Sequence, residues 1–171
     1  MATSLTRGRA IQNKDNVGGL KAVYFVDFGD LGNATLGSND EITAFDGTFD
    51  AHKYELNGAN SFEQPINTSR ENGTTFYEQT LSIVLPALTA VDHKELKLII
   101  IDRKQVVVET NNGEFFVVGL ENGADVTGGT VSTGAAMGDL TGYSLTITAR
   151  EKDIAPFVEG FLSNSGINVV A

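Results

Sequence analysis

The chain has 171 residues, with 19 glycines, three prolines, no cysteine and a formal net charge of −10. This length can bury one good core and predicts a single domain over residues 1–171, and the lack of cysteine excludes a disulfide framework and a thiolate metal site. The acidic balance argues against tight capture of nucleic acid, which draws its affinity from basic contacts with phosphates. No run approaches the ~18 apolar residues that span a bilayer, so we expect no membrane partner.

The charge is unevenly distributed along the chain. Residues 1–21 carry a net charge of +3 and the remainder carries −13, so a basic N-terminal arm over residues 1–19 precedes an acidic body. A basic arm on an acidic body could dock onto a neighbouring copy of the same chain, which is the head-to-tail arrangement that builds rings and filaments. The candidates for such contacts in the arm are Arg7, Arg9 and Lys14. The alternative is a solvated, flexible tail.

Many glycines, few prolines and runs of Val, Ile, Thr and Phe predict a mainly β fold with tight turns. Residues 20–28 read as a buried strand, followed by a Gly/Asn-rich loop over residues 29–40 that has almost nothing to bury. We expect further strands within residues 41–56 and 59–68.

Residues 61–85 hold the strongest local signal, two β-prone runs that flank Glu71-Asn72-Gly73. Asn-Gly between such runs predicts a hairpin with a type I′ turn, because both residues tolerate positive φ. The returning run alternates, with apolar side chains mostly at odd positions from 77 to 85 and polar side chains mostly at even positions. One face of this strand should therefore pack while the other meets water.

A short helix is predicted between Pro86 and Lys97, with Thr89 and Asp92 in a capping arrangement and Leu88, Val91 and Leu96 packing on the sheet.

A second hairpin is predicted from residues 97–110 and 114–120 around an Asn-Asn-Gly turn. Residues 123–138 are rich in Gly, Thr and Ala and predict a long surface loop, which is usually functional or ordered by a partner. Residues 143–149 alternate as a strand, and residues 155–162 predict a final turn of helix.

No motif for metal, nucleophilic or phosphate chemistry is present in the sequence. His52 and His93 fall on different predicted elements, and a lone His is more often a surface or hydrogen-bonded residue than a ligand. The Gly-rich segment lacks GK[ST] and any basic residue. Two of Glu63, Glu71 and Glu78 could form a carboxylate pair for glycoside hydrolysis, but a solvated acidic face is favoured because no aromatic sugar platform accompanies them. We expect no enzymatic activity, no cofactor and no metal.

In its strand order, its single helix and the closing segment YSLTITAREKDIAPFVEGFL, the chain resembles bacteriophage tail tube proteins over most of residues 20–162. The resemblance implies an antiparallel β-sandwich or barrel with one short flanking helix and with long hairpins that close a multi-subunit β-barrel. It further implies a virion structural protein, made in the host cytoplasm, whose hexameric rings stack into the tail tube. Its partners would be copies of itself, other tail proteins, and DNA that passes during ejection without specific binding.

Under this resemblance, residues 61–85 would form one hairpin that lines the lumen, and carboxylates there would repel DNA phosphates so that the polymer slides. The lumen-facing candidates are Asp46, Asp50, Glu63, Glu71 and Glu78. Arg70 beside the turn would place a positive charge near one rim, where it could pair with Glu71 of a neighbour.

Two other interpretations stay open from the sequence. One is another virion structural protein, such as a head–tail connector, a stopper or a capsid decoration protein. The other is a non-viral β-rich binding module or an unrecognised hydrolase, because architecture does not dictate function.

Overall fold

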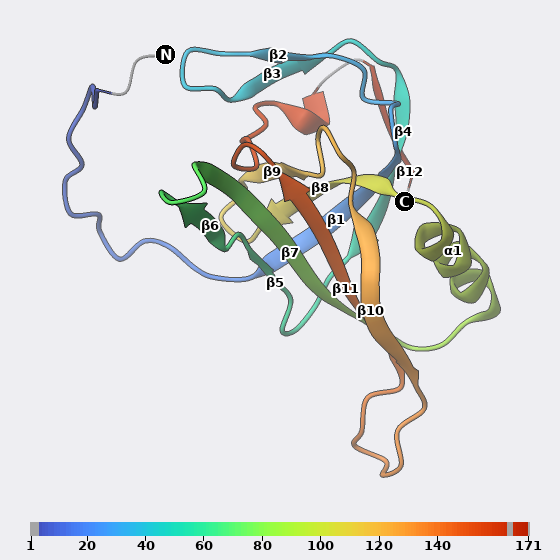
Figure 1. Ribbon diagram of the computed structural model, residues 1–171. Helices are drawn as coiled ribbons and strands as arrows, with labels where there is room; N and C mark the ends of the chain where they lie inside the picture. The colour runs from blue at the N-terminus through green and yellow to red at the C-terminus, as the bar shows by residue number, and fades with distance from the viewer. Residues whose placement is uncertain (1–3, 164–165, 171) are drawn as a thin grey trace.

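The structure is a computed structural model that describes residues 4–163 and 166–170 (Figure 1). Within these residues it contains twelve β-strands, one α-helix and one short 3₁₀ helix, so the predicted mainly β class is confirmed. Two five-stranded sheets and a small two-stranded sheet account for all the strands.

The first sheet has the strand order β12-β4-β1-β8-β9. All neighbours are antiparallel except β12 and β4, which run parallel. Its strands are β1 (Leu20–Asp27), β4 (Phe49–Glu55), β8 (Lys104–Thr110), β9 (Phe115–Val118) and β12 (Ile167–Val170). The predicted strand over residues 20–28 and the turn at Asn111-Asn112-Gly113 between β8 and β9 are thus confirmed.

The second sheet has the order β10-β11-β7-β5, and β6 also pairs with β7 beyond β5. All its pairs are antiparallel. Its strands are β5 (Ser61–Glu63), β6 (Ile66–Ser69), β7 (Thr74–Pro86), β10 (Asp125–Ser132) and β11 (Gly142–Glu151). The third sheet pairs β2 (Ala34–Leu36) with β3 (Ile42–Phe45).

The main hydrophobic core lies between the two large sheets, in a sandwich-like layout. Val23 and Phe25 of β1 meet Leu81 and Ile83 of β7 in one buried cluster, to which β8 and β11 also contribute. The alternation predicted for residues 74–85 is confirmed, because Gln79, Leu81 and Ile83 are buried while Thr80 and Ser82 between them are only partly covered. Neither large sheet closes into a barrel within the described part of the chain.

A second core covers the opposite face of the first sheet. Tyr24 and Val26 of β1 pack there with Ile42 of β3 and with Val158 and Phe161 of the C-terminal segment. The middle strands of the first sheet, β1 and β8, are therefore buried on both faces, which explains the near-continuous apolar run in β1.

Two buried polar side chains of the second sheet bond the backbone that follows β9. The Gln79 Oε1 accepts from the Gly119 N–H at 3.0 Å, and Glu151 Oε1 accepts from the N–H groups of Glu121 and Asn122 at 3.2 and 2.9 Å. These bonds join the two sheets at one end, where aliphatic packing alone would not set their relative position.

The helix α1 (Ala90–Ile101) begins as predicted, since the Thr89 side chain caps it by accepting from the Asp92 N–H at 3.1 Å. It extends beyond the predicted end, however, so residues 97–101 are helical and not part of the second hairpin. Leu96 and Ile99 explain this extension, because their i, i+3 spacing points both side chains into the main core. The predicted packing of Val91 is wrong, since it is 72% exposed.

Two segments predicted as loops contain strands. Residues 29–40 include β2, and half of the predicted loop over residues 123–138 is β10, which pairs with β11 on both sides of a bulge between Val126 and Gly128. β10 can pair despite its small side chains, because strand pairing uses backbone groups. At Gly129 an added Cβ would lie 2.2 Å from the Ser144 carbonyl oxygen, and φ is +148°, so the strand requires glycine there.

Two further local predictions are wrong. The turn at residues 70–73 is not type I′, because only Gly73 has positive φ, at 64°. Most of residues 155–162 is extended and not helical: the Val158 N–H donates to Phe115 O at 2.9 Å, and the Val117 N–H donates to Pro156 O at 3.2 Å. Only Phe161–Ser163 forms a 3₁₀ turn.

Candidate assembly surfaces

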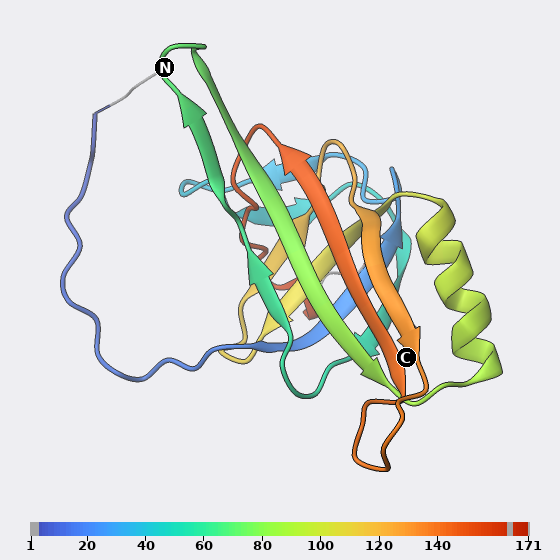
Figure 2. The ribbon, with the colours of Figure 1, turned by 60° about the horizontal axis from the view of Figure 1, so that its bottom comes forward.

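The outer face of the second sheet is uncovered by other described elements, as Figure 2 shows. Register places Glu63 opposite Thr80, and Glu78 opposite Arg150, and side chains of directly paired residues point to the same face. We call this surface the polar face. Val84, opposite Ser144, also lies on this face. The polar residues of this face include Ser61, Glu63, Glu78, Thr80, Ser82, Asp125, Thr130, Ser144, Thr146, Thr148 and Arg150.

The polar face is rich in hydroxyl groups and weakly acidic. Glu63, Glu78 and Asp125 give it three carboxylates against the single guanidinium of Arg150. A broad β surface of hydroxyls with excess negative charge presents little for DNA phosphates to bind, since binding to phosphates draws on clustered Lys and Arg.

The β6–β7 hairpin projects past the rest of the second sheet (Figure 2). β11 pairs with β7 only as far as Tyr77, so residues 74–76 pair with β6 alone. Arg70 and Glu71 are both exposed in the turn at its tip. The tip is thus available to meet another molecule.

Asp46 and Asp50 lie elsewhere. Asp46 follows β3, and Asp50 is on β4 of the first sheet, where its Oδ1 accepts from Asn168 Nδ2 at 2.9 Å. The structure therefore brings Glu63 and Glu78 together on the polar face and places Glu71 at the hairpin tip. It sets Asp50 on the first sheet and Asp46 just after β3, both away from the polar face.

The second sheet ends at β10 on one side and at β5 with β6 on the other, and no further strand pairs with these edges within the described residues. The helix α1 lies beside β10 (Figure 2). Val131 on β10 is 58% exposed although its partner Tyr143 is buried. An open edge presents unpaired backbone N–H and C=O groups that can template pairing with another chain. The sequence predicted a loop here because Gly128 and Gly129 interrupt the β-branched residues of this segment.

The N-terminal arm runs clear of the body in both views (Figures 1 and 2). Arg7, Arg9 and Lys14 are all exposed on it. Among the described residues, the first hydrogen bonds from arm to body are at Val17, whose N–H and C=O bond the Asn112 side chain, each at 3.0 Å.

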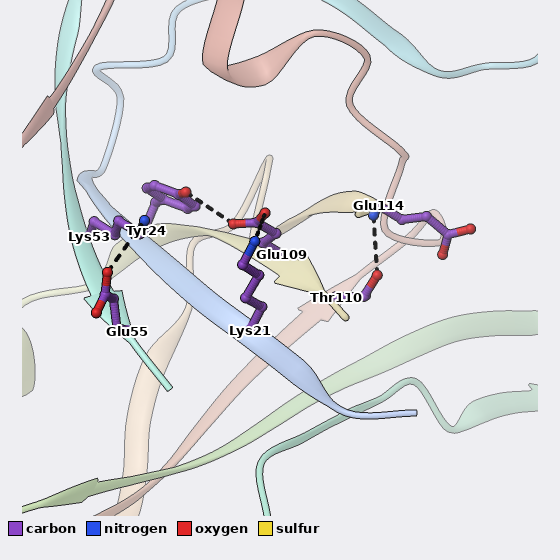
Figure 3. Close-up of polar contacts among 7 residues, drawn as sticks. All are labelled: Lys21, Tyr24, Lys53, Glu55, Glu109, Thr110 and Glu114. Carbon is purple, nitrogen blue, oxygen red and sulfur yellow. Dashed lines mark hydrogen bonds and ion pairs between the residues drawn. The ribbon is translucent and has the colours of Figure 1, made fainter. Parts of the chain in front are cut away.

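A polar cluster that the sequence did not reveal lies between β1 and β8 (Figure 3). The buried Tyr24 hydroxyl donates to Glu109 Oε2 at 3.1 Å, and Lys21 Nζ lies 3.8 Å from Glu109 Oε1. Burial and then the charge of Glu109 raise the pKa of Tyr24 to about 12. Tyr24 is thus a neutral donor at physiological pH, and the cluster holds two strands in register.

Glu151 provides a prediction on pH dependence. Burial raises the pKa of its carboxyl above the usual value, against the lowering effect of the Asn122 and Glu121 N–H groups. The folded state therefore holds this proton more tightly than the unfolded state, so the group's contribution to stability is present below the unfolded pKa and is lost as pH rises through the folded pKa.

We expect Glu151→Gln to remove that loss while keeping both backbone hydrogen bonds on Oε1. Thermal melts of the variant and of the original chain from pH 4 to pH 8 should show a smaller decline with rising pH in the variant. The matched control is Glu71→Gln at the exposed hairpin tip, which should leave the original pH dependence unchanged. Parallel curves for Glu151→Gln and the original chain would contradict the prediction.

No group of three or more His, Cys, Asp or Glu that could hold a metal ion occurs among the described residues. His52 is on β4 and His93 on α1, and the His93 ring lies beside Tyr143 with centroids 6.2 Å apart. None of the helices in the described ranges is long and apolar enough to cross a membrane.

Comparison with known proteins returned no matching family, curated protein or solved structure.

Proposed function

We propose that this chain is the structural subunit of a phage tail tube, which self-assembles into stacked rings that form the channel for DNA. The observation that carries the proposal is the second sheet, which combines an uncovered polar face, two open edges and a projecting hairpin. A monomer would leave both edges exposed to uncontrolled pairing, whereas a ring removes them.

The edges suit a head-to-tail contact, in which β10 of one copy pairs beside β5 and β6 of the next. Because the contact joins two different surfaces, it closes into a ring when the rotation between copies allows. Six copies, the number in the family that the sequence resembles, would contribute about 24 strands; at a spacing of about 4.8 Å and a tilt of about 40° the backbone would enclose a channel roughly 48 Å across. Such a channel is wider than a DNA duplex.

The polar face would line this channel. Glu63 and Glu78 would then be lumen residues, and Glu71 would lie near one rim with Arg70. Their charge would keep DNA from adhering at close range. The protein would reside in the virion tail, and other tail proteins would begin and end the tube.

Negative-stain electron microscopy of the purified protein across a concentration series tests the proposal. Rings or open-ended tubes with a central channel would support it. Trimers or single particles at every concentration would contradict it, and trimers that bind capsids without stacking would favour a decoration protein.

A further inference from the structure

The C-terminal segment and the β8–β9 turn border an open groove of about 680 Å³. Its charged lining consists of Glu41, Glu114 and Glu159, and no Lys or Arg lines it. Its apolar lining includes Phe157 and Leu162, which are 49% and 57% exposed. We call this site the acidic groove.

The carboxylates of Glu114 and Glu159 have no ion-pair or hydrogen-bond partner among the described residues, and Glu41 accepts only from the Asn39 N–H at 2.8 Å. Figure 3 shows the Glu114 side chain pointing away from the strands. The acidic groove thus combines three uncompensated negative charges with exposed apolar side chains, which suits a ligand that is both basic and apolar.

The N-terminal arm has that chemistry. Leu5 and Ile11 are almost fully exposed, at 96% and 101%, and they flank Arg7 and Arg9. All four positions are odd, so in an extended chain their side chains share one side, over a length of about 20 Å. The intervening residues are small or uncharged. Hydrogen bonds of the described residues before Val17 are local to the arm, so these side chains are free to bind elsewhere.

We propose that the arm of one copy docks in the acidic groove of a second copy, with Arg7 and Arg9 against Glu114 and Glu159 and with Leu5 and Ile11 against Phe157 and Leu162. This inference rests on the self-assembly in the proposed function and adds the partner surface.

Docking in the groove of the same copy would require the arm to reverse its direction at Val17. Val17 is held at Asn112, next to Gly113 and Glu114 of the groove, and the chain then leads away from the body (Figure 1). In an extended arm Ile11 lies about 20 Å and Leu5 about 40 Å from Val17, so these side chains can reach the groove of an adjoining copy.

The absence of native cysteine allows a direct test by disulfide trapping in the full-length chain. Two single variants, Ile11→Cys and Leu162→Cys, are mixed at low concentration and oxidised. We expect a covalent dimer of the 18.2 kDa chain in this mixture. The matched control pairs Ile11→Cys with Val91→Cys, an exposed position on α1, and should give no dimer above background.

Charge substitutions test the proposed ion pairs between the arm and the groove. Glu114→Lys with Glu159→Lys in the Leu162→Cys chain should lower the dimer yield by about tenfold, because like charges across a contact are repulsive. Arg7→Glu with Arg9→Glu in the Ile11→Cys chain should restore it. An unchanged yield with the Lys variants, or a dimer equally strong with the α1 control, would overturn the proposal.

The remaining outcomes separate this inference from the proposed function. If a chain with both cysteines gives only an internal disulfide, the arm binds its own groove and the inference fails, whatever the microscopy shows. If tubes form but no dimer is trapped, the arm–groove contact is contradicted while the proposed tail tube function is supported. If the dimer is trapped and its yield changes with the charge substitutions but no ring or tube forms, the arm–groove contact is supported while the proposed tail tube function is contradicted.

Discussion

Val131→Lys should abolish assembly at concentrations where the original chain forms rings or tubes. Val131 is exposed at the open edge of β10, on the side of the sheet that faces the core. A lysine that points inward at an edge must be buried when a further strand is added, so it opposes edge-to-edge pairing. We expect the concentration needed for assembly to rise at least about tenfold, which corresponds to ~1.4 kcal/mol per contact.

Sedimentation and negative-stain microscopy measure this effect, and a thermal melt shows whether the fold is kept. An exposed substitution of this kind should change the free energy of unfolding by no more than about 0.5 kcal/mol. The matched control is Val169→Lys on β12, the edge strand of the first sheet, which should leave assembly intact. Tubes that form normally in Val131→Lys would exclude the β10 edge as the ring contact.

Tyr24→Ala should cause the largest loss of stability among single substitutions considered for this chain. The Tyr24 ring is fully buried and makes an edge contact with Phe161, with ring centroids 5.1 Å apart. Removing a buried aromatic ring costs about 3–5 kcal/mol, a large part of the 5–15 kcal/mol typical of a whole domain. Urea denaturation at pH 7 measures the change in the free energy of unfolding.

Tyr24→Phe is the matched variant, because it keeps the ring and removes only the hydroxyl donor to Glu109. We expect it to cost about 1–3 kcal/mol, since a buried carboxylate loses a partner. Because the pKa of Tyr24 is raised from 10.0 to about 12, its contribution is present below pH 10 and is lost as pH rises through about 12. The two chains should therefore converge in stability at high pH. Equal stability at pH 7 would show that the hydroxyl is unimportant.

The mainly β class, the strand over residues 20–28, the two hairpin turns and the start of α1 could be predicted because each depends on near neighbours. Gly73 is needed for its turn, the Thr89 side chain bonds a backbone N–H three residues on, and alternation in β7 separates a core side from a water side. The sequence also predicted the basic arm, and Glu63 and Glu78 on one side of a strand pair.

Only the tertiary structure decided which segments pair across long separations. β10 is interrupted by Gly128 and Gly129, yet it pairs because its backbone fits against β11, most closely at Gly129. The C-terminal segment is extended because β9 and β3 offer it backbone partners. The bond between Tyr24 and Glu109 joins residues 85 positions apart, and the acidic groove joins Glu41, Glu114 and Glu159. Local patterns carry turn geometry and alternation, whereas these contacts arise from the free energy of packing the whole chain.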